Sequence, residues 1–563
     1  MLFNTYNKDR FLQRFIYIIG KVSKILLIAI LLLASILRLP WLDLYPPGFS
    51  GDEAGQGYSA YSILNTGKDE WGEPFPLFPR SFGDFKPPLY TYLTIPSIAI
   101  FGLNEFSVRL PASILGILTC LSLYYLAKKL TKNEPIAIWS TLLLVVNPWH
   151  IQLSRTASEA GVGVLFFTLG LLMFLIYKER GKLLNLSALF FGIALYSYHS
   201  FRFFVILFVI TIFAVEFKNL FVRKNILAGI IFLVLIIPIL FNFEKVYLRA
   251  SDVGIFSQSQ IMSYFENKGT SLAPQFIDKL FDNKFWFVTS RFTENYLSYF
   301  SPTFLFSGSR SDSSYLNFPR FPLIYTFELF FLTLAIFALV KDKFPYKRYI
   351  IIWLLLSPIA AALTYGSGNT QRFTTILPLT AMLSGWGIVI FSTKLTQITR
   401  LKLRTVFIII VLFTFINLTF FLHYYFAKLP QNPPESLRSE YGQIFRKIWE
   451  IEKNYDEVVI SKVFTQPQIF VAYYGKVDPI YYQKASSDWL RYEDSDKLFV
   501  DQLQSWNLGK FYFEDLDWEN KDSKRINALI VSGPQDFPDG TVPIFSVRDN
   551  KGKIKYMMVE TQK

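Results

Sequence analysis

Residues 226–243 have the sequence ILAGIIFLVLIIPILFNF, an apolar run without a charged residue. A helix needs about 20 such residues to cross the hydrocarbon core of a membrane. Comparable runs recur along this 563-residue chain, of which 52% is hydrophobic and 18% aromatic. A soluble protein can be nearly half apolar, but it does not gather its apolar residues into repeated runs of this length. The sequence therefore predicts a polytopic membrane protein of mainly α-helical fold.

Eleven runs are candidate transmembrane helices, and the charges between them predict their orientation. The runs are residues 22–39, 109–130, 134–148, 160–177, 183–198, 202–217, 226–243, 322–340, 349–364, 373–393 and 405–422. The N-terminus and every second short loop are strongly basic, as cytoplasmic segments are. We therefore expect a plasma-membrane protein with its N-terminus inside and its C-terminus outside. Much of the net charge of +14 then reflects topology, so nucleic acid is not an expected partner.

A twelfth apolar stretch and the first of the eleven runs need separate interpretation. Pro88–Leu103 is as long as some of the spans, but a crossing there would put the basic loops on alternating sides. We therefore expect it to lie along the outer membrane surface. The first run ends in Arg38-Leu39-Pro40-Trp41 and lacks a small-residue cleavage pattern, which predicts a retained anchor rather than a signal peptide.

The predicted transmembrane domain covers residues 1–423, with outer loops at 40–108 and 244–321, and residues 424–563 are predicted to form an extracytoplasmic α/β domain. Apolar residues at helical spacing indicate an amphipathic helix over Leu437–Ile451. Strands are expected at Val458–Ser461, Lys510–Phe513, Ala528–Val531, Val542–Val547 and Ile554–Val559. The single cysteine, Cys120, excludes an intrachain disulfide and a thiolate metal cage.

Two carboxylates, Asp52 and Glu53, begin a short helix predicted in the first outer loop, which also carries Tyr58. A carboxylate where the membrane meets water suits a general base that acts on a membrane-bound substrate. However, Ser50 and Glu53 also have the spacing of a capping box, and an acid such as Asp52 stabilises the first turn of any helix. The residues alone leave both interpretations open.

Lys86 directly precedes Pro87 and Pro88, which are favourable residues for the start of a helix. An ammonium group beside helix N-terminal amides is suited to binding an anion. A lysine that simply extends its charge from the membrane interface into water gives the same pattern.

These segments together resemble a known family. The segments are Arg38-Leu39-Pro40, Asp52-Glu53, Lys86-Pro87-Pro88-Leu89-Tyr90, Phe101-Gly102 and Val108-Arg109-Leu110-Pro111. Their order and spacing resemble those of the protein O-mannosyltransferase and lipid A aminoarabinose transferase group. This group is glycosyltransferase family 39, of the GT-C fold, and its counterpart of Pro88–Leu103 is a juxtamembrane helix. The resemblance is sharp over about residues 36–200. It is weaker later, where Gln371-Arg372-Phe373 before Leu377-Pro378 is the clearest match.

The resemblance implies transfer of a sugar, mannose-like in the family, from a polyprenyl-phosphate carrier to a protein, lipid or glycan acceptor at the outer face of the membrane. Asp52 corresponds to the catalytic base, Glu53 to a second acid, and Lys86 to a lysine that binds the carrier phosphate. In aminoarabinose transferases an acid directly precedes that lysine. Here Phe85 does so, and Asp84 lies one residue further back.

Other ionisable residues are expected near the outer ends of the spans, where they are costly unless used or paired. We expect Arg372 to be a second phosphate ligand. The candidate substrate-binding residues are Tyr58, Asp84, Arg109, Arg155, Glu159, His199 and Arg202. Alternatively, Arg155 and Glu159 pair with each other at their i, i+4 spacing, and His199 is an ordinary polar residue of the interface.

No cofactor or metal site is predicted, although a divalent metal requirement stays open. Asp494-Ser495-Asp496 and Asp515-Leu516-Asp517 imitate the Asp-x-Asp motif of nucleotide-sugar enzymes, but they occur among many acids of the polar tail.

Two alternative functions remain. A transporter or flippase of lipid-linked substrates is expected to show charges or broken helices at mid-bilayer, or a repeat relating its halves. The charges here gather at one predicted face, which favours an enzyme. A non-catalytic surface or assembly protein leaves the cluster of Asp52 and Lys86 unexplained.

Overall fold

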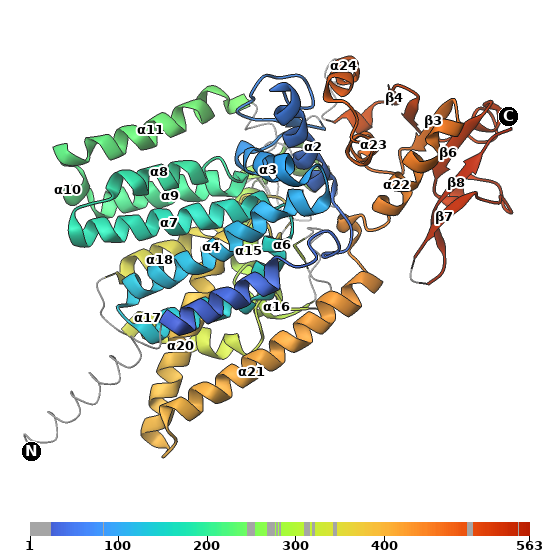
Figure 1. Ribbon diagram of the computed structural model, residues 1–563. Coiled ribbons are helices and arrows are strands. Elements are labelled where there is room, and N and C mark those ends of the chain that lie inside the picture. The colour runs from blue at the N-terminus through green and yellow to red at the C-terminus, as the bar shows by residue number, and fades with distance from the viewer. Residues whose placement is uncertain are drawn as a thin grey trace, which may run out of the picture. The chain divides into compact units, whose positions relative to one another are not determined.

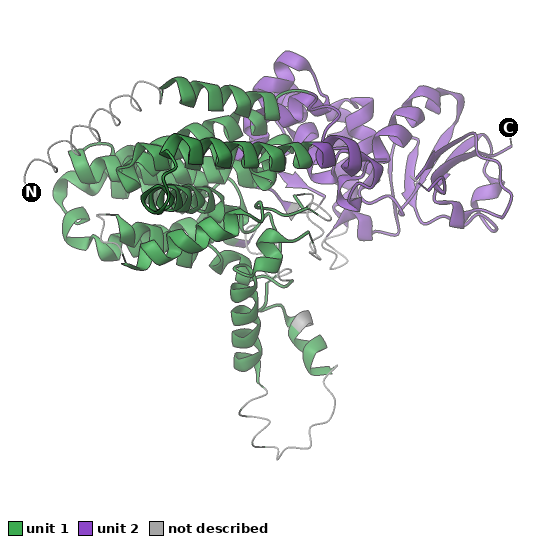
Figure 2. Ribbon diagram, turned by 90° about the horizontal axis from the view of Figure 1, so that it is seen from below, with its two compact units in different colours: residues 1–40, 112–243, 250–422 green, residues 41–111, 244–249, 423–563 purple. Residues whose placement is uncertain are grey.

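The computed structural model describes residues 24–82, 84–244, 254–266, 276, 280, 283–308, 316–317, 321–341, 346–366, 368–491, 499–549 and 551–562. The side chain of Asp84, the pair Asp494 and Asp496, and the basic residues before Lys24 lie outside these described residues. The chain divides into two compact units (Figure 2). Unit 1 comprises Met1–Pro40, Ala112–Phe243 and Ala250–Leu422, and unit 2 comprises Trp41–Pro111, Glu244–Arg249 and His423–Lys563. The predicted domain boundary at residue 423 stays a prediction.

Unit 1 is built from apolar helices that pack side by side (Figure 1). Residues 24–38 are helical. The longer helices are α4 (Glu105–Thr131, which begins in unit 2), α5 (Glu134–Val146), α6 (Pro148–Arg155), α7 (Glu159–Arg180), α8 (Leu184–Ala194), α9 (His199–Val215), α11 (Ile226–Phe241), α15 (Lys284–Ser298), α17 (Glu328–Lys341), α18 (Lys347–Leu356), α20 (Leu377–Ile398) and α21 (Leu403–His423). Shorter ones are α10 (Phe217–Leu220), α13 (Gln258–Glu266), α16 (Pro302–Phe306) and α19 (Ile359–Ala362).

The protein is a multi-pass membrane protein. In the part of the chain that the structure describes, 5 helices are long and apolar enough to cross a membrane, or up to 6 if a pair bent by 59° forms one span. These are Glu105–Thr131, Glu159–Arg180, Arg223–Phe241, Thr374–Ile398 and Leu403–Gln431, with the pair Glu134–Val146 and Pro148–Arg155. The eleven predicted spans are therefore not confirmed.

Helix breaks account for two of the predicted runs, and three other runs correspond to the helices α8, α9 and α17, which have only 11, 17 and 14 residues. The run 134–148 ends at Asn147, because the ring of Pro148 disfavours a helical conformation of the residue before it. Pro148 instead begins α6, and the Asn147 side chain accepts a hydrogen bond from the amide of His150 at 2.8 Å. The run 349–364 is divided between α18 and α19 at Pro358, which cannot donate a backbone hydrogen bond. Hydropathy alone does not register such breaks.

The stretch Pro88–Leu103 forms α3 (Pro88–Phe101), a helix of 14 residues in unit 2. At about 1.5 Å per residue it is roughly 21 Å long, shorter than the hydrocarbon core of about 30 Å. This length agrees with the expectation that the helix does not cross the membrane.

A mixed sheet of six strands organises residues 457–560 of unit 2, which confirms the predicted C-terminal α/β structure. Its order is β4-β5-β3-β6-β8-β7, with β3 parallel to both β5 and β6. The strands are β3 (Glu457–Ser461), β4 (Ser505–Leu508), β5 (Phe511–Glu514), β6 (Ala528–Ser532), β7 (Phe545–Arg548) and β8 (Ile554–Glu560). The helices are α22 (Tyr441–Ile451), α23 (Pro467–Gly475) and α24 (Pro479–Trp489). A cluster including Val459, Ile530 and Met557 forms an apolar core.

Five of these strands match the predicted segments, whereas β4 was not predicted. β7 begins at Phe545 rather than Val542, because Pro543 lacks the amide that a paired strand needs. The first outer loop adds α2 (Gly51–Thr66) and a short antiparallel pair, β1 (Arg80–Ser81) and β2 (Asp84–Phe85). Helix α2 packs against α3, α23 and α24, so the loop and the tail share one compact unit.

Candidate active site

The N-terminus of α2 and the segment before α3 bring Asp52 and Lys86 together. Asp52 is the second residue of α2, and Lys86 follows β2. The Nζ atom of Lys86 donates to Oδ1 of Asp52 at 2.9 Å. The Asp52 side chain is 44% exposed, whereas that of Lys86 is 14% exposed. The ring of Phe82 lies beside the ammonium group, with its centroid 5.7 Å from Nζ. The pair thus presents an accessible carboxylate beside a largely buried cation.

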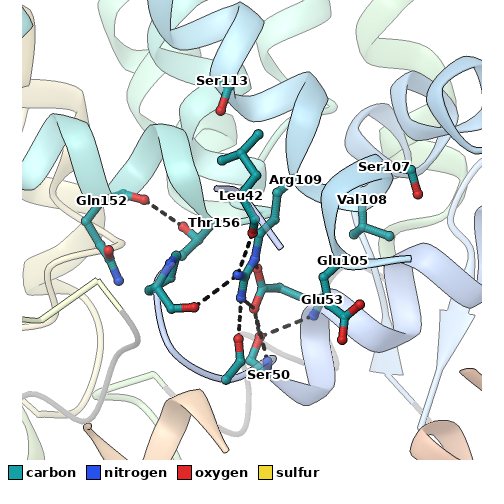
Figure 3. A network of polar contacts seen from close by, with 12 residues as sticks. Leu42, Ser50, Glu53, Glu105, Ser107, Val108, Arg109, Ser113, Gln152 and Thr156 are labelled. Atoms are coloured by element: carbon teal, nitrogen blue, oxygen red, sulfur yellow. Dashed lines mark hydrogen bonds and ion pairs between the residues drawn. The ribbon is translucent and has the colours of Figure 1, made fainter. Parts of the chain in front are cut away.

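Glu53 and Arg109 form a second ion pair, which is wholly buried (Figure 3). Nε of Arg109 donates to Oε1 of Glu53 at 2.8 Å, and both side chains are 0% exposed. The guanidinium also donates to the backbone carbonyls of Leu42, Pro46 and Gly48. Arg109 therefore fixes the loop that leads from the first helix into α2.

The capping box expected at α2 is confirmed. The Ser50 hydroxyl accepts from the amide of Glu53 at 3.3 Å, and Oε2 of Glu53 accepts from the amide of Ser50 at 3.0 Å. Both carboxylate oxygens of Glu53 thus contact protein groups, Oε1 at Arg109 and Oε2 at Ser50. Of the two predicted acids, Asp52 is the one with an exposed carboxylate, and the catalytic role of either residue stays a prediction.

Tyr58 contacts the C-terminal part of unit 2. Its hydroxyl donates to the carbonyl of Val477 at 3.0 Å, and its ring centroid lies 4.9 Å from that of Tyr482. Burial raises the pKa of the Tyr58 hydroxyl, and nearby Glu70 adds to this. These contacts pack α2 against the segment that leads into α24, and substrate binding by Tyr58 remains untested.

Glycines allow the C-terminal residues to approach the first outer loop closely. A Cβ atom on Gly48 would lie 2.2 Å from the carbonyl oxygen of Leu437. A Cβ atom on Gly51 would lie 2.3 Å from Oε1 of Gln466. Such distances are well below van der Waals contact. Gly48 therefore depends on the absence of a side chain, because the contact is with backbone, whereas at Gly51 the contact is with the flexible end of the Gln466 side chain.

The remaining predicted residues belong to unit 1, apart from Arg109 and the undescribed side chain of Asp84. Arg155 is buried and donates to the carbonyls of Leu37 at 3.1 Å and Pro40 at 2.8 Å, so it holds the end of the first helix. Glu159 is the first residue of α7 and is 5% exposed. Their roles in substrate binding stay predictions.

His199 and Arg202 contact each other at the start of α9, with Nη1 of Arg202 3.0 Å from Nδ1 of His199. Arg202 also donates to the carbonyl of Leu195. Arg372 lies in the turn before α20, where its amide donates to the side chain of Asn369. Its proposed contact with a carrier phosphate stays a prediction.

Sequence reasoning missed two buried acids, Asp69 and Glu70, which follow α2 in the chain. The side chain of Asp69 accepts hydrogen bonds from the backbone amides of Trp71, Glu73 and Arg80. Oε2 of Glu70 accepts one from the side-chain hydroxyl of Ser59 at 3.3 Å. Burial, followed by the charge of neighbouring Asp69, raises the pKa of Glu70 to about 8. In the sequence these acids follow Lys68 in a polar stretch that resembles a solvated loop, so no signal indicated their burial.

A groove of about 380 Å³ also lies in unit 2. Its lining includes Phe49, Glu105, Arg446, Tyr474 and Asp549. Glu105 accepts from Arg446 and, at 3.2 Å, from the Tyr474 hydroxyl. Charged and aromatic groups line the groove together, which suits a hydrophilic ligand rather than a lipid tail.

Within the described ranges, no group of three or more His, Cys, Asp or Glu side chains is placed to hold a metal ion. Of the two Asp-x-Asp segments, the described one is engaged locally. Asp515 pairs with Lys462 at 3.1 Å, and Asp517 accepts hydrogen bonds from Asn520.

Comparison with known proteins gives a family match for part of the chain. Residues 85–241 match the model of the family described as dolichyl-phosphate-mannose-protein mannosyltransferase. An uncharacterized protein of Aquifex aeolicus (strain VF5) is 32% identical over 97 residues, which are 17% of this chain and 19% of that protein. The matched region thus spans about a fifth of that relative's length.

Solved structures show a similar fold. ArnT from Cupriavidus metallidurans in the apo state aligns with 12% identity over 96% of this chain and 98% of its own, with a TM-score of 0.51. The structure of ArnT bound to undecaprenyl phosphate aligns over the same shares with 13% identity and a TM-score of 0.53. These findings confirm the predicted family resemblance over residues 85–241, and they show that the fold is similar to that of ArnT.

Proposed function

We propose that this protein transfers a sugar, with inversion at C1, from a polyprenyl-phosphate carrier to an acceptor hydroxyl at the outer face of the plasma membrane. The observation that carries the proposal is the Asp52–Lys86 pair, which sets an exposed carboxylate 2.9 Å from an ammonium group. Lys86 falls within the family segment 85–241, and the similar ArnT binds undecaprenyl phosphate. The acceptor is a hydroxyl of a protein, lipid or glycan.

Asp52 is the general base of the proposed reaction. Its carboxylate takes the proton of the acceptor hydroxyl while the acceptor oxygen forms a bond to C1 of the sugar. The bond between C1 and the phosphate oxygen breaks in the same step, and its electron pair leaves with the carrier phosphate. Correct placement of such a base accelerates a reaction by roughly 100- to 10,000-fold.

Lys86 stabilises the negative charge of the departing phosphate. An ammonium group carries three N–H donors, so it can contact a phosphate while it still neighbours Asp52. As the phosphate draws the ammonium towards itself, the carboxylate loses part of its stabilising partner and becomes a stronger base. Binding of the donor therefore prepares Asp52 for proton transfer.

Glu53 and Arg109 position this pair rather than react. Their buried contacts fix the loop before α2 and cap the helix from which Asp52 projects. Arg372 is proposed as a second ligand of the carrier phosphate. Residues 424–563 are proposed to face the cell exterior, like the site itself, and to bind the acceptor.

The test is a transfer assay with purified protein in lipid nanodiscs. Radiolabelled polyprenyl-phosphate sugars are supplied with candidate acceptors, and both released carrier phosphate and labelled product are measured. Lys86→Met is compared with Lys68→Met, a matched change at an exposed lysine of the same outer loop.

The proposal predicts transfer by the wild type and by Lys68→Met, with a large loss in Lys86→Met. A wild-type protein that neither binds nor cleaves any of the lipid-linked sugars would contradict it. Movement of intact lipid-linked sugar between leaflets, without cleavage, would instead support the transporter alternative.

A further inference from the structure

The loop between β3 and α23, residues 462–466, brings the C-terminal sheet to the start of helix α2. β3 is parallel to both of its neighbours, β5 and β6, and the loop leaves its carboxyl end. Chain connections from the carboxyl ends of parallel strands are where α/β sheets commonly bind ligands, particularly where neighbouring connections run to opposite sides. From β3 the chain continues to the edge strand β4 and then to β5 on one side, and from β5 it crosses to β6 on the other side.

This loop is held in a defined conformation. The amide of Thr465 donates to the hydroxyl of Tyr441 at 3.0 Å, and Nη2 of Arg438 donates to the Thr465 hydroxyl at 3.0 Å. The loop ends at Gln466, whose φ of 56° and ψ of 46° lie in the left-handed region. Residues other than glycine adopt this region uncommonly, and such conformations cluster at functional sites. The fixed backbone therefore sets the direction of the Gln466 side chain.

The side-chain amide of Gln466 lies close to Gly51, the residue directly before Asp52. Its Oε1 atom occupies a position 2.3 Å from where a Cβ atom of residue 51 would be. Gly51 has a φ outside the left-handed region, so its backbone conformation does not require glycine. A Cβ atom at this position would therefore have to displace the amide, which is the flexible end of the Gln466 side chain.

Gln466 is half-buried, and its side chain makes no hydrogen bond within the described part of the chain. A primary amide provides two N–H donors and a carbonyl acceptor. Because Gln466 is only partly buried, its amide is open to water, and a ligand bound at the edge of the candidate site can take the place of that water. A sugar hydroxyl, which both donates and accepts, is the matching chemistry.

We propose that Gln466 is part of the active site and hydrogen-bonds a hydroxyl of the reacting sugar substrate beside Asp52. This inference rests on the proposed transfer function. The hydroxyl belongs either to the donor sugar or to a glycan acceptor. The C-terminal α/β structure thus contributes a residue to specificity directly.

The experiment compares Gln466→Ala with Gln483→Ala in the transfer assay. Gln483 is the matched control, because its amide also contacts α2, donating to Ser62 and Thr66 at the other end of that helix. Loss of one hydrogen bond between neutral groups corresponds to about a 2- to 13-fold fall in kcat/KM for Gln466→Ala. Gln483→Ala is expected to keep the wild-type value.

Gly51→Ala provides an independent variant, because its methyl group displaces the flexible amide without touching backbone. It is expected to lower kcat/KM by a similar factor in the wild type and to have little further effect when Gln466 is already Ala. Two fully additive losses would overturn the inference.

Deoxy analogues identify the hydroxyl. The wild type is expected to discriminate against one deoxy donor or one deoxy glycan acceptor, and Gln466→Ala is expected to lose that discrimination. Loss confined to donor analogues assigns the contact to the donor sugar, and loss confined to acceptor analogues assigns it to the acceptor. An active wild type whose Gln466→Ala variant retains kcat/KM and all discrimination overturns the inference but not the transfer function. An inactive wild type overturns the transfer function itself.

Discussion

Replacing Glu53 with Gln removes one charge from a pair whose side chains are both 0% exposed. The amide can keep one oxygen at Ser50, but it leaves the guanidinium of Arg109 with a neutral neighbour in a buried place. Breaking a buried ion pair by removing one partner destabilises a protein by about 3–5 kcal/mol. Arg109 keeps its three backbone carbonyls, so the lower part of this range is expected.

The assay is thermal unfolding of the purified variants in detergent. A loss of about 3 kcal/mol corresponds to a fall in midpoint on the order of 10 °C for a unit of about 200 residues. The double variant Glu53→Gln/Arg109→Met replaces the pair with uncharged side chains. Replacing both partners of a buried ion pair often changes the free energy of unfolding very little. However, the carbonyls of Leu42, Pro46 and Gly48 lose their donor in this double variant, so we expect it to recover only part of the lost midpoint. A Glu53→Gln protein with a wild-type midpoint but no transfer activity would refute this reasoning and make Glu53 a group that acts on substrate.

Three further outcomes are expected. The pKa of Glu70 is about 8 in the folded protein and near 4.5 in the unfolded chain. Between these pH values the folded state binds the proton more tightly than the unfolded state does, so the stability falls as pH rises. Glu70→Gln should abolish this part of the pH dependence of the unfolding midpoint, and an unchanged profile would contradict it. Lys86→Met should weaken binding of polyprenyl phosphate by about 10- to 100-fold, the loss of one charge-assisted contact, and unchanged affinity would reduce Lys86 to an interfacial lysine. Cysteines at the exposed positions Phe75 and Val542 should react with an impermeant maleimide on intact cells, while one at Lys402 should not, and the reverse pattern would overturn the proposed topology.

Periodicity predicted the C-terminal sheet well, because strands such as β6 and β8 are continuous apolar segments bounded by turn residues. Hydropathy predicted membrane helices but not their count, because Pro148 and Pro358 break two apolar runs and because α8, α9 and α17 are shorter than the about 20 residues that a transmembrane helix needs. Proline breaks inside a run are visible in the sequence, and they could have been weighed against hydropathy.

The site was predictable only in part. Asp52 and Lys86 were found through a family resemblance, and the structure brings them together at 2.9 Å. Gln466 and Gly51 lie far apart in the sequence, so no local pattern could indicate that they meet. The burial of Glu70 depends on packing between α2 and the segments around it, which likewise leaves no local signal.

The most direct test of the account is the transfer rate of Asp52→Asn. Asn has nearly the size of Asp and is tolerated in the first turn of a helix, but it cannot take a proton from the acceptor. Donor binding and single-turnover transfer are measured on the purified variant, beside Asp539→Asn, a change at an exposed acid of the C-terminal part. The account predicts a fall of at least about 100-fold in the rate for Asp52→Asn, with donor binding retained and with Asp539→Asn unaffected. A folded, donor-binding Asp52→Asn protein that transfers sugar at close to the wild-type rate would contradict the central claim.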